Sequence, residues 1–152
     1  MAFRFVRLKG AITATPIFID VYGSGTIQRG SVVEFDRVNK RVAPATANST
    51  YTNIFGIALD YIQGASEIKT RVIPFVQGQL WEADCNNTPS TVMIFIKHAL
   101  TNAMTLANTS YDQTVATGIF MAYTIETIRV NTMIGEFIRA PIGFTTNSPG
   151  YF

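Results

Sequence analysis

Residues 31–42 of this 152-residue chain read Ser-Val-Val-Glu-Phe-Asp-Arg-Val-Asn-Lys-Arg-Val, and they give the clearest indication of its fold. Val33 and Phe35 point to one side of an extended chain, and the acidic residues that follow each of them point to the other. This alternation is typical of a strand with one buried face. Asn39-Lys40 suits a tight turn, after which the chain returns as a second strand. The stretch therefore predicts a β-hairpin with a polar tip.

Short apolar runs continue on both sides of this hairpin, separated by Gly, Pro and polar residues. They have the length of strands rather than of helices. We expect strands at residues 17–21, 54–59, 70–76, 119–125, 128–130 and 135–139. Residues 79–84 fit either a strand or one short helical turn.

Several of these runs carry a further signal. Residues 54–59 are nearly all apolar, so both faces should be covered, and Gly56 should permit a bend or a close backbone approach. Pro74 cannot donate a ladder hydrogen bond, which indicates an edge position or a bulge. Alternation in the run at 119–125 places four side chains on one face: Ile119, Met121, Tyr123 and Ile125.

The composition favours β-structure throughout. The chain has 17 Ile, 11 Val and 19 Thr but 5 Leu, and Cβ-branched residues pack well on a pleated surface. Crossover helices are not expected, so the pattern predicts an all-β protein with a single small β-barrel-like or β-sandwich-like domain. We place that domain at residues 11–140, with an N-terminal arm or edge strand at 1–10 and a C-terminal tail at 141–152.

The charge balance is weak. Twelve basic and ten acidic side chains give a formal net charge of +2, and 14% of residues are charged, against roughly a quarter in an average soluble domain. Such a balance creates no strong field for nucleic acid. Charges interrupt the apolar residues at 1–9, so we expect no secretion signal there, and no apolar run has the length of a membrane helix.

The candidate catalytic and metal-ligating residues form no known motif. His98, the one histidine of the chain, has no nucleophile signature beside it, and we expect a surface or loop residue. Glu82, Asp84, Cys85 and His98 have metal-ligating chemistry but no ligand spacing. We therefore expect no cofactor, no metal and no catalytic residue.

Three other patterns resemble parts of known sites. Glu34 and Asp36 are spaced like a carboxylate pair of a glycosidase, but a solvated strand face predicts them equally well. Gly23-Ser24-Gly25 lacks the rest of a phosphate loop and indicates a turn. Arg37, Lys40 and Arg41 near Tyr51 leave open a barrel that binds single-stranded nucleic acid by charge and stacking.

Both ends of the chain carry more apolar area than free tails normally do. The residues concerned are Phe3, Arg4, Phe5 and Arg7 at the start and Tyr151 and Phe152 at the end. These residues could cover an edge of the protein's own sheet, or they could anchor it to a neighbouring subunit. The low charge content points to surfaces that partners cover.

A longer string of features resembles the capsid decoration proteins of tailed bacteriophages, of the lambda head-stabilising type. The stretch Gly25-Thr-Ile-Gln-Arg-Gly30-Ser-Val-Val-Glu-Phe-Asp36 is followed by Val42-Ala-Pro-Ala45 and by Ile54-Phe-Gly56-Ile-Ala-Leu59. The later segments Gln79-Leu-Trp-Glu-Ala-Asp84, Asn108-Thr109, Gly118-Ile-Phe and Phe137-Ile-Arg139 are similar to those of phage β-barrel structural proteins. The resemblance covers about residues 25–140.

The resemblance implies a non-enzymatic protein of the virion, made in the host cytoplasm. It implies a homotrimer on the outside of the mature head that bridges neighbouring major capsid protein subunits, with no membrane or specific nucleic-acid partner. In that family an N-terminal arm adds to capsid strands, which maps by position onto residues 2–9. This chain is longer than the lambda type. A tail, connector or head-fibre protein of a phage, and a single-strand-binding barrel, are the alternatives.

Overall fold

The computed structural model describes residues 3–9, 16–64, 68–126 and 129–139. Strands dominate these residues, which confirms the predicted mainly-β fold class. The one helical element within the described ranges is a single 3-10 turn, Thr91–Met93. No described helix has the length and hydropathy needed to cross a membrane.

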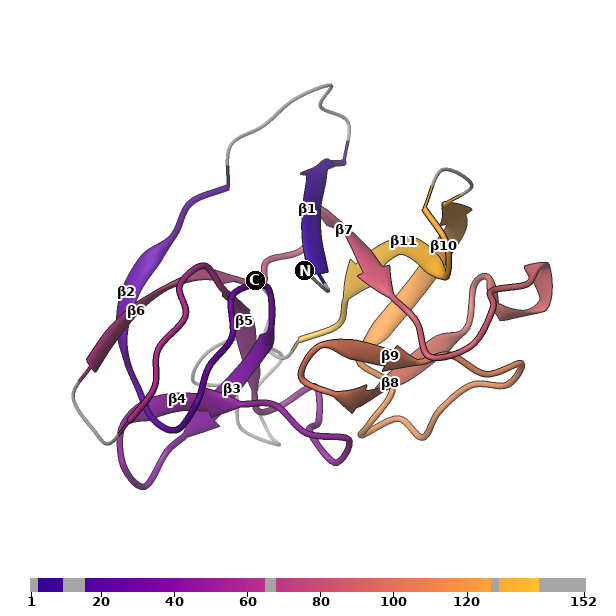
Figure 1. Ribbon diagram of the computed structural model, residues 1–152. Coiled ribbons are helices and arrows are strands. Elements are labelled where there is room, and N and C mark those ends of the chain that lie inside the picture. The colour runs from indigo at the N-terminus through magenta and orange to yellow at the C-terminus, as the bar shows by residue number, and fades with distance from the viewer. Residues whose placement is uncertain (1–2, 10–15, 65–67, 127–128, 140–152) are drawn as a thin grey trace.

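Five strands from the first half of the chain close into a small barrel, on the left in Figure 1. They are β2 (Ile19–Gly23), β3 (Val32–Asp36), β4 (Arg41–Pro44), β5 (Ile54–Ala58) and β6 (Ile68–Pro74). Their order around the barrel is β2-β4-β3-β5-β6. The predicted hairpin at residues 31–42 forms β3 and β4, and Lys40 takes a positive φ of 57° in its turn.

Six strands form a second, antiparallel sheet, which lies beside the barrel in Figure 1. They are β1 (Phe3–Leu8), β7 (Gln79–Asp84), β8 (Lys97–Asn102), β9 (Thr105–Ala107), β10 (Phe120–Glu126) and β11 (Thr132–Phe137), in the order β1-β7-β11-β10-β8-β9. The segment 79–84, for which the sequence left two possibilities, is therefore a strand. β1 lies at the sheet edge, and its pairing with β7 shifts register between Phe5 and Arg7.

One apolar core joins the barrel to the sheet. Its buried side chains include Val32, Ile54 and Ile57 of the barrel and Trp81 and Met133 of the sheet. A separate, smaller cluster fills the barrel itself and consists of Ile27, Val33, Val42, Phe55, Ala58, Ile62 and Val72. The two parts of the fold thus share buried surface rather than meeting through a linker.

Phe75 is the main aromatic contribution of the barrel half to the shared core. It follows β6 directly, and its ring stacks on Phe137 of β11 with centroids 4.1 Å apart. Trp81 lies edge-on to it at 5.9 Å. Because aromatic side chains bury more area than aliphatic ones, these contacts account for much of the attachment between the two halves.

The structure confirms the close backbone approach expected at Gly56. A Cβ atom at this position would lie 2.1 Å from the backbone oxygen of Ile73 on β6. Any side chain would force β5 and β6 apart, so only glycine allows this part of the barrel wall to close.

Two expectations for the last strands were wrong. A register shift between Ala122 and Thr124 breaks the common face expected for Ile119, Met121, Tyr123 and Ile125. The fully buried residues within β10 are instead Phe120 and Ala122. Arg129 and Val130 lie in a turn rather than a strand, and the last strand begins at Thr132. Residue 128 is outside the described residues.

Candidate partner-binding surfaces

β1 holds its two aromatic residues inside the protein. Phe3 is buried, with its ring centroid 5.3 Å from that of Phe137. Phe5 lies edge-on to Trp81 at 5.5 Å. The structure therefore places both side chains in contacts within this chain. This agrees with the first of the two possibilities, in which the residues cover an edge of the protein's own sheet.

The two arginines of β1 differ. Arg4 Nε donates to Glu82 Oε1 at 2.7 Å, and its Nη2 donates to Asp84 Oδ1 at 2.6 Å. Arg7 is exposed, next to exposed Val6 and Leu8. Of the residues proposed from the sequence for partner binding, Arg7 is thus the one that the described structure leaves on the surface. Tyr151 and Phe152 lie outside the described residues.

The end of β1 is fixed by a charged group on β11. Lys9 Nζ lies 2.7 Å from Glu136 Oε2, and the Tyr123 hydroxyl donates to the same oxygen at 2.6 Å. Burial pushes the pKa of Glu136 upward, but the hydrogen bonds from Lys9, Tyr123 and the Gly78 N–H outweigh it and lower the pKa. Glu136 therefore stays ionised and holds the edge strand to the sheet.

His98 is fully buried in β8, so its expected place on the surface or in a loop was wrong. Its Nε2 lies 2.9 Å from the Met93 carbonyl oxygen, and its Nδ1 accepts from the Thr109 N–H at 3.3 Å. That pairing assigns the proton to Nε2. Burial lowers its pKa. With both nitrogens occupied by backbone groups, His98 holds the 3-10 turn at Met93 and the loop at Thr109 in place.

The other titratable candidates are engaged in separate contacts. No three His, Cys, Asp or Glu side chains come together as a metal site within the described part of the chain. Cys85 is buried, and this burial raises the pKa of its thiol to about 12. Glu34 accepts hydrogen bonds from Ser49 and Asn53. Asp36 accepts from Asn39 at the hairpin turn.

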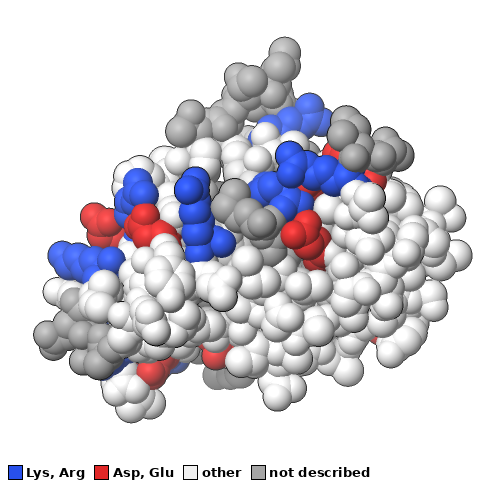
Figure 2. Space-filling model, viewed as in Figure 1, with Lys and Arg blue, Asp and Glu red and all other residues white. Residues whose placement is uncertain are grey.

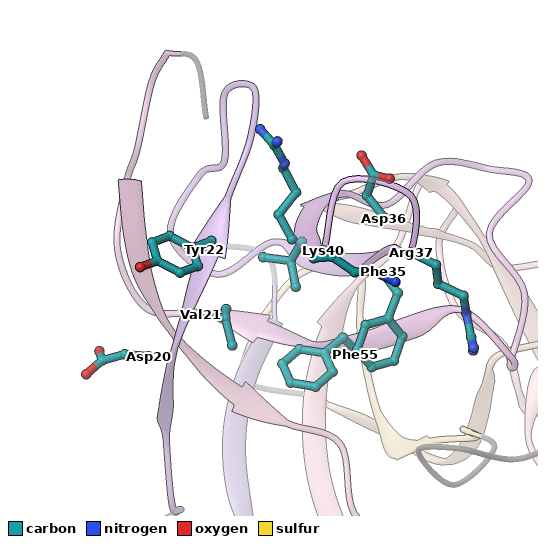
Figure 3. Close-up of a pocket in the computed structure, with 10 residues that line it drawn as sticks. Asp20, Val21, Tyr22, Phe35, Asp36, Arg37, Lys40 and Phe55 are labelled. Carbon is teal, nitrogen blue, oxygen red and sulfur yellow. The ribbon is translucent and has the colours of Figure 1, made fainter. Parts of the chain in front are cut away.

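A groove opens in the barrel wall between β2 and the β3–β4 hairpin. It has a volume of about 530 Å³, which lies within the usual range for ligand sites. Its apolar part consists of Val21, Val42, Phe35 and Phe55. Figure 3 shows Val21, Phe35 and Phe55 turned toward one another, with the two phenyl rings 4.7 Å apart.

The hairpin side of this groove is basic, and it contains the Arg37, Lys40 and Arg41 cluster noted in the sequence. Tyr51 is not a lining residue and packs against the shared core instead. The faces of Phe35 are occupied, since its ring lies 5.6 Å from the Arg37 guanidinium and 5.5 Å from that of Arg139. Base stacking needs open aromatic faces, and this arrangement offers little such area.

The opposite end of the molecule is nearly free of charge. Residues 86–125 contain two charged side chains, Lys97 and Asp112, and Figure 2 shows an almost uncharged surface over the half that holds β8 and β9. We call the exposed apolar residues of this stretch the charge-poor surface: Val92, Phe95, Tyr111 and Val115. The segments that carry them are bonded together, because the Lys97 N–H donates to Asp112 and the Gln113 N–H donates to the Lys97 oxygen.

Phe95 is the most unusual residue of the charge-poor surface. Its side chain is 71% exposed and its φ is +61°, a conformation that a bulky residue rarely adopts. Its N–H donates to the Ala122 oxygen at 2.8 Å, and its ring lies 6.2 Å from that of Tyr123. The fold thus holds a large apolar side chain in water in a strained backbone conformation.

Sequence reasoning missed both Phe95 and the groove. No local signal marks Phe95, because an apolar run gives no indication of left-handed backbone at one residue. The groove joins residues 20–22 to residues 35–42 and Phe55, and only the pairing of distant strands brings them together. The basic cluster on the hairpin was the one part visible in the sequence.

Comparison with known proteins gave no match to a family model, a curated protein or a solved structure.

Proposed function

We propose that this protein is a non-enzymatic virion component that decorates the outer surface of a tailed-phage capsid. In this role it stabilises the head by bridging major capsid protein subunits. The sequence motifs of the barrel, from residue 25 to residue 59, are what relate it to this class of protein.

The observation that carries the proposal is the charge-poor surface. Interface cores are depleted of charged residues and enriched in aromatic ones, and Val92, Phe95, Tyr111 and Val115 have this character. Large apolar side chains exposed on a surface with few charges are typical of a face that a partner covers. A protein that spends its working life bound to a lattice has that cover.

The mechanism would be burial of surface between subunits. A stable interface hides about 800 Å² per partner, and apolar area contributes about 25 cal/mol per Å² removed from water. A few aromatic anchors commonly supply most of that free energy. Phe95 is the best placed anchor, since its ring projects from a backbone that hydrogen bonding to Ala122 holds in place.

The test is to add the protein to undecorated, expanded phage heads and to measure binding and the temperature at which the heads break open. Wild-type protein should bind and raise that temperature. A Val92→Lys and Val115→Lys double variant should lose both effects, because each lysine would have to leave water on binding.

Val76→Lys and Val130→Lys together form the matched control. Both valines are exposed but lie outside the charge-poor surface, in the loop before β7 and in the turn before β11. The control should bind like the wild-type protein. Absence of wild-type binding, or binding without a rise in disruption temperature, would refute the proposal, and imaging that finds the protein on a tail would replace it by the alternative.

A further inference from the structure

The barrel is closed along only part of β2. On one side β2 pairs with β6 over its whole length, from Ile19 to Gly23. On the other side, among the residues that the structure describes, it pairs with β4 at Gly23–Val42 alone. Alternate N–H and C=O groups of a strand point to each side, so in the described part of the chain the stretch from Ile19 to Tyr22 has no strand partner on the side of the groove.

The groove lies along this unpaired edge. Asp20, Val21 and Tyr22 of β2 form one wall, and residues of the hairpin form the other. Four residues of extended chain span about 13 Å, so a short peptide segment can lie along the free part of β2. An apolar side chain of this segment can then pack against Val21, which lies at the open side of the apolar cluster.

The lining of the groove carries more positive than negative side chains. Arg37, Lys40 and Arg41 line it together with Asp20 and Asp36, and Figure 3 shows both aspartates, and also Arg37, extending away from its apolar centre. Asp36 is further occupied by the side chain and backbone N–H of Asn39, hydrogen bonds that lower its pKa. Carboxylates brought by a ligand would therefore meet cations rather than other carboxylates.

We propose that this groove binds an extended, acidic segment of a partner protein, which adds to β2 as a further strand. Its backbone pairs with the free edge of β2, one apolar side chain packs against Val21, and flanking glutamates or aspartates pair with the basic hairpin wall. The inference deepens the proposed function. It rests on that function only in taking the major capsid protein as the source of the bound segment.

The direct test is a titration of the full chain into a fluorescently labelled synthetic peptide that alternates glutamate and valine. Fluorescence anisotropy should show saturable binding. The same peptide with lysine in place of glutamate should bind at least tenfold more weakly, since its charge opposes that of the hairpin. Equal affinity for both peptides would overturn the proposal, and so would tighter binding of an oligothymidylate, which would assign the groove to nucleic acid.

Two N-methylated peptides test the strand addition itself. In one, every valine amide is methylated, and in the other, every glutamate amide. An added strand uses one alternate set of N–H groups on its paired edge, and the side-chain alternation fixes the register. One peptide should therefore lose binding at least tenfold while the other retains it. If both peptides keep full affinity, strand addition is excluded.

Charge reversal on the protein locates the site. Arg37→Glu with Lys40→Glu should weaken peptide binding at least tenfold, whereas Arg29→Glu, at an exposed position in the turn before β3 that does not line the groove, should leave it unchanged. The same variants on expanded heads separate the two proposals. Peptide binding without head binding supports the groove and refutes the decoration role. Head binding that survives Arg37→Glu with Lys40→Glu supports decoration and excludes the major capsid protein as the source of the bound segment, and peptide binding that survives the same variant overturns the groove.

Discussion

His98 shows how a single buried residue couples stability to pH. Its Nδ1 accepts a hydrogen bond from the Thr109 N–H, and its burial lowers its pKa below the usual 6.5. The unfolded chain takes up a proton near pH 6.5 while the folded chain does not, so the unfolded state binds more protons. Stability should therefore fall as the pH drops below about 6.5.

Urea unfolding followed at pH 7.5 and at pH 5.0 measures this effect. His98→Gln keeps hydrogen-bonding capacity but cannot ionise, so the part of the pH dependence that stems from His98 should disappear in the variant. The carboxylates contribute equally to both proteins, which makes the difference between them the relevant quantity. Identical pH profiles for the two proteins would show that His98 titrates alike in the folded and unfolded states.

Substitution of Phe95 should affect binding to a partner much more than it affects stability. A left-handed conformation costs an L-residue about 1–2 kcal/mol, while glycine adopts it freely but loses more entropy on folding. Phe95→Gly should therefore change the free energy of unfolding by no more than about 1 kcal/mol. If Phe95 is an anchor for a partner, the same variant should bind expanded heads at least tenfold more weakly.

The control for Phe95 is Tyr111→Gly, which removes another exposed aromatic side chain without relieving a left-handed residue. We expect this control to be the less stable of the two variants. A loss of several kcal/mol on Phe95→Gly would instead mean that the ring supports the fold through Tyr123 and that its exposure has no functional meaning.

At the scale of the element, an ionic contact made by Arg4 attaches β1 to β7. Arg7, an exposed arginine on the same strand, serves for comparison. Arg4 lies against Glu82, which is buried, and Asp84, which is half-buried. Arg4→Ala removes a positive charge and two hydrogen-bond donors from these carboxylates. We therefore expect a loss of about 1–3 kcal/mol in the free energy of unfolding. Arg7→Ala, on the exposed part of β1, should change it by less than about 0.5 kcal/mol.

Chemical denaturation of both variants at pH 7 checks this expectation. Glu82→Gln should restore part of the stability lost in Arg4→Ala, because it removes the carboxylate left behind. Weak head binding by Arg4→Ala with unchanged stability would contradict the structural role and favour the capsid contact that the sequence suggested. Deletion of β1 is a poor test of that contact, since it would expose the core around Phe3 and Trp81.

The elements that could be predicted are those whose signals are local. The hairpin at 31–42 combines alternation with a turn, and Gly56 lies in a run too apolar for a solvated face, so both expectations held. The face of β10 was wrong because the bulge after Ala122 depends on its pairing with β11. His98 looked exposed beside Lys97 because nothing in the sequence shows that loops at Met93 and Thr109 cover it.

The candidate surfaces also have features that the sequence could predict and features that it could not. The low charge content could be read from the composition, and it led to the expectation of covered surfaces. The sequence also shows that residues 86–125 hold few charges. It does not show that the segments of this stretch lie together, because they are joined by bonds from Lys97 to residues 112–113. The free edge of β2 depends on where barrel closure stops, which is a property of the pairing between distant strands.

At the scale of the whole molecule, the shared core predicts that the barrel and the sheet unfold together. The core contains residues of both parts, and Phe75 packs from the barrel side against both Phe137 and Trp81. Neither part can open without exposing these rings, so an intermediate with one part folded should be poorly populated. Trp81 fluorescence, which reports on the sheet, and amide exchange at Ile57, which reports on the barrel, should give the same free energy of unfolding.

Phe75→Ala tests the origin of this coupling. Truncation of a buried phenylalanine costs about 3–5 kcal/mol, and because its neighbours belong to both halves, the variant should lower the stability measured by both probes equally. Val76→Ala, at the adjacent exposed position, should leave both within about 0.5 kcal/mol. Two separate transitions in the wild-type protein would mean that barrel and sheet fold independently. In that case, a partner that binds at the groove would stabilise the barrel but leave the free energy of unfolding of the sheet unchanged.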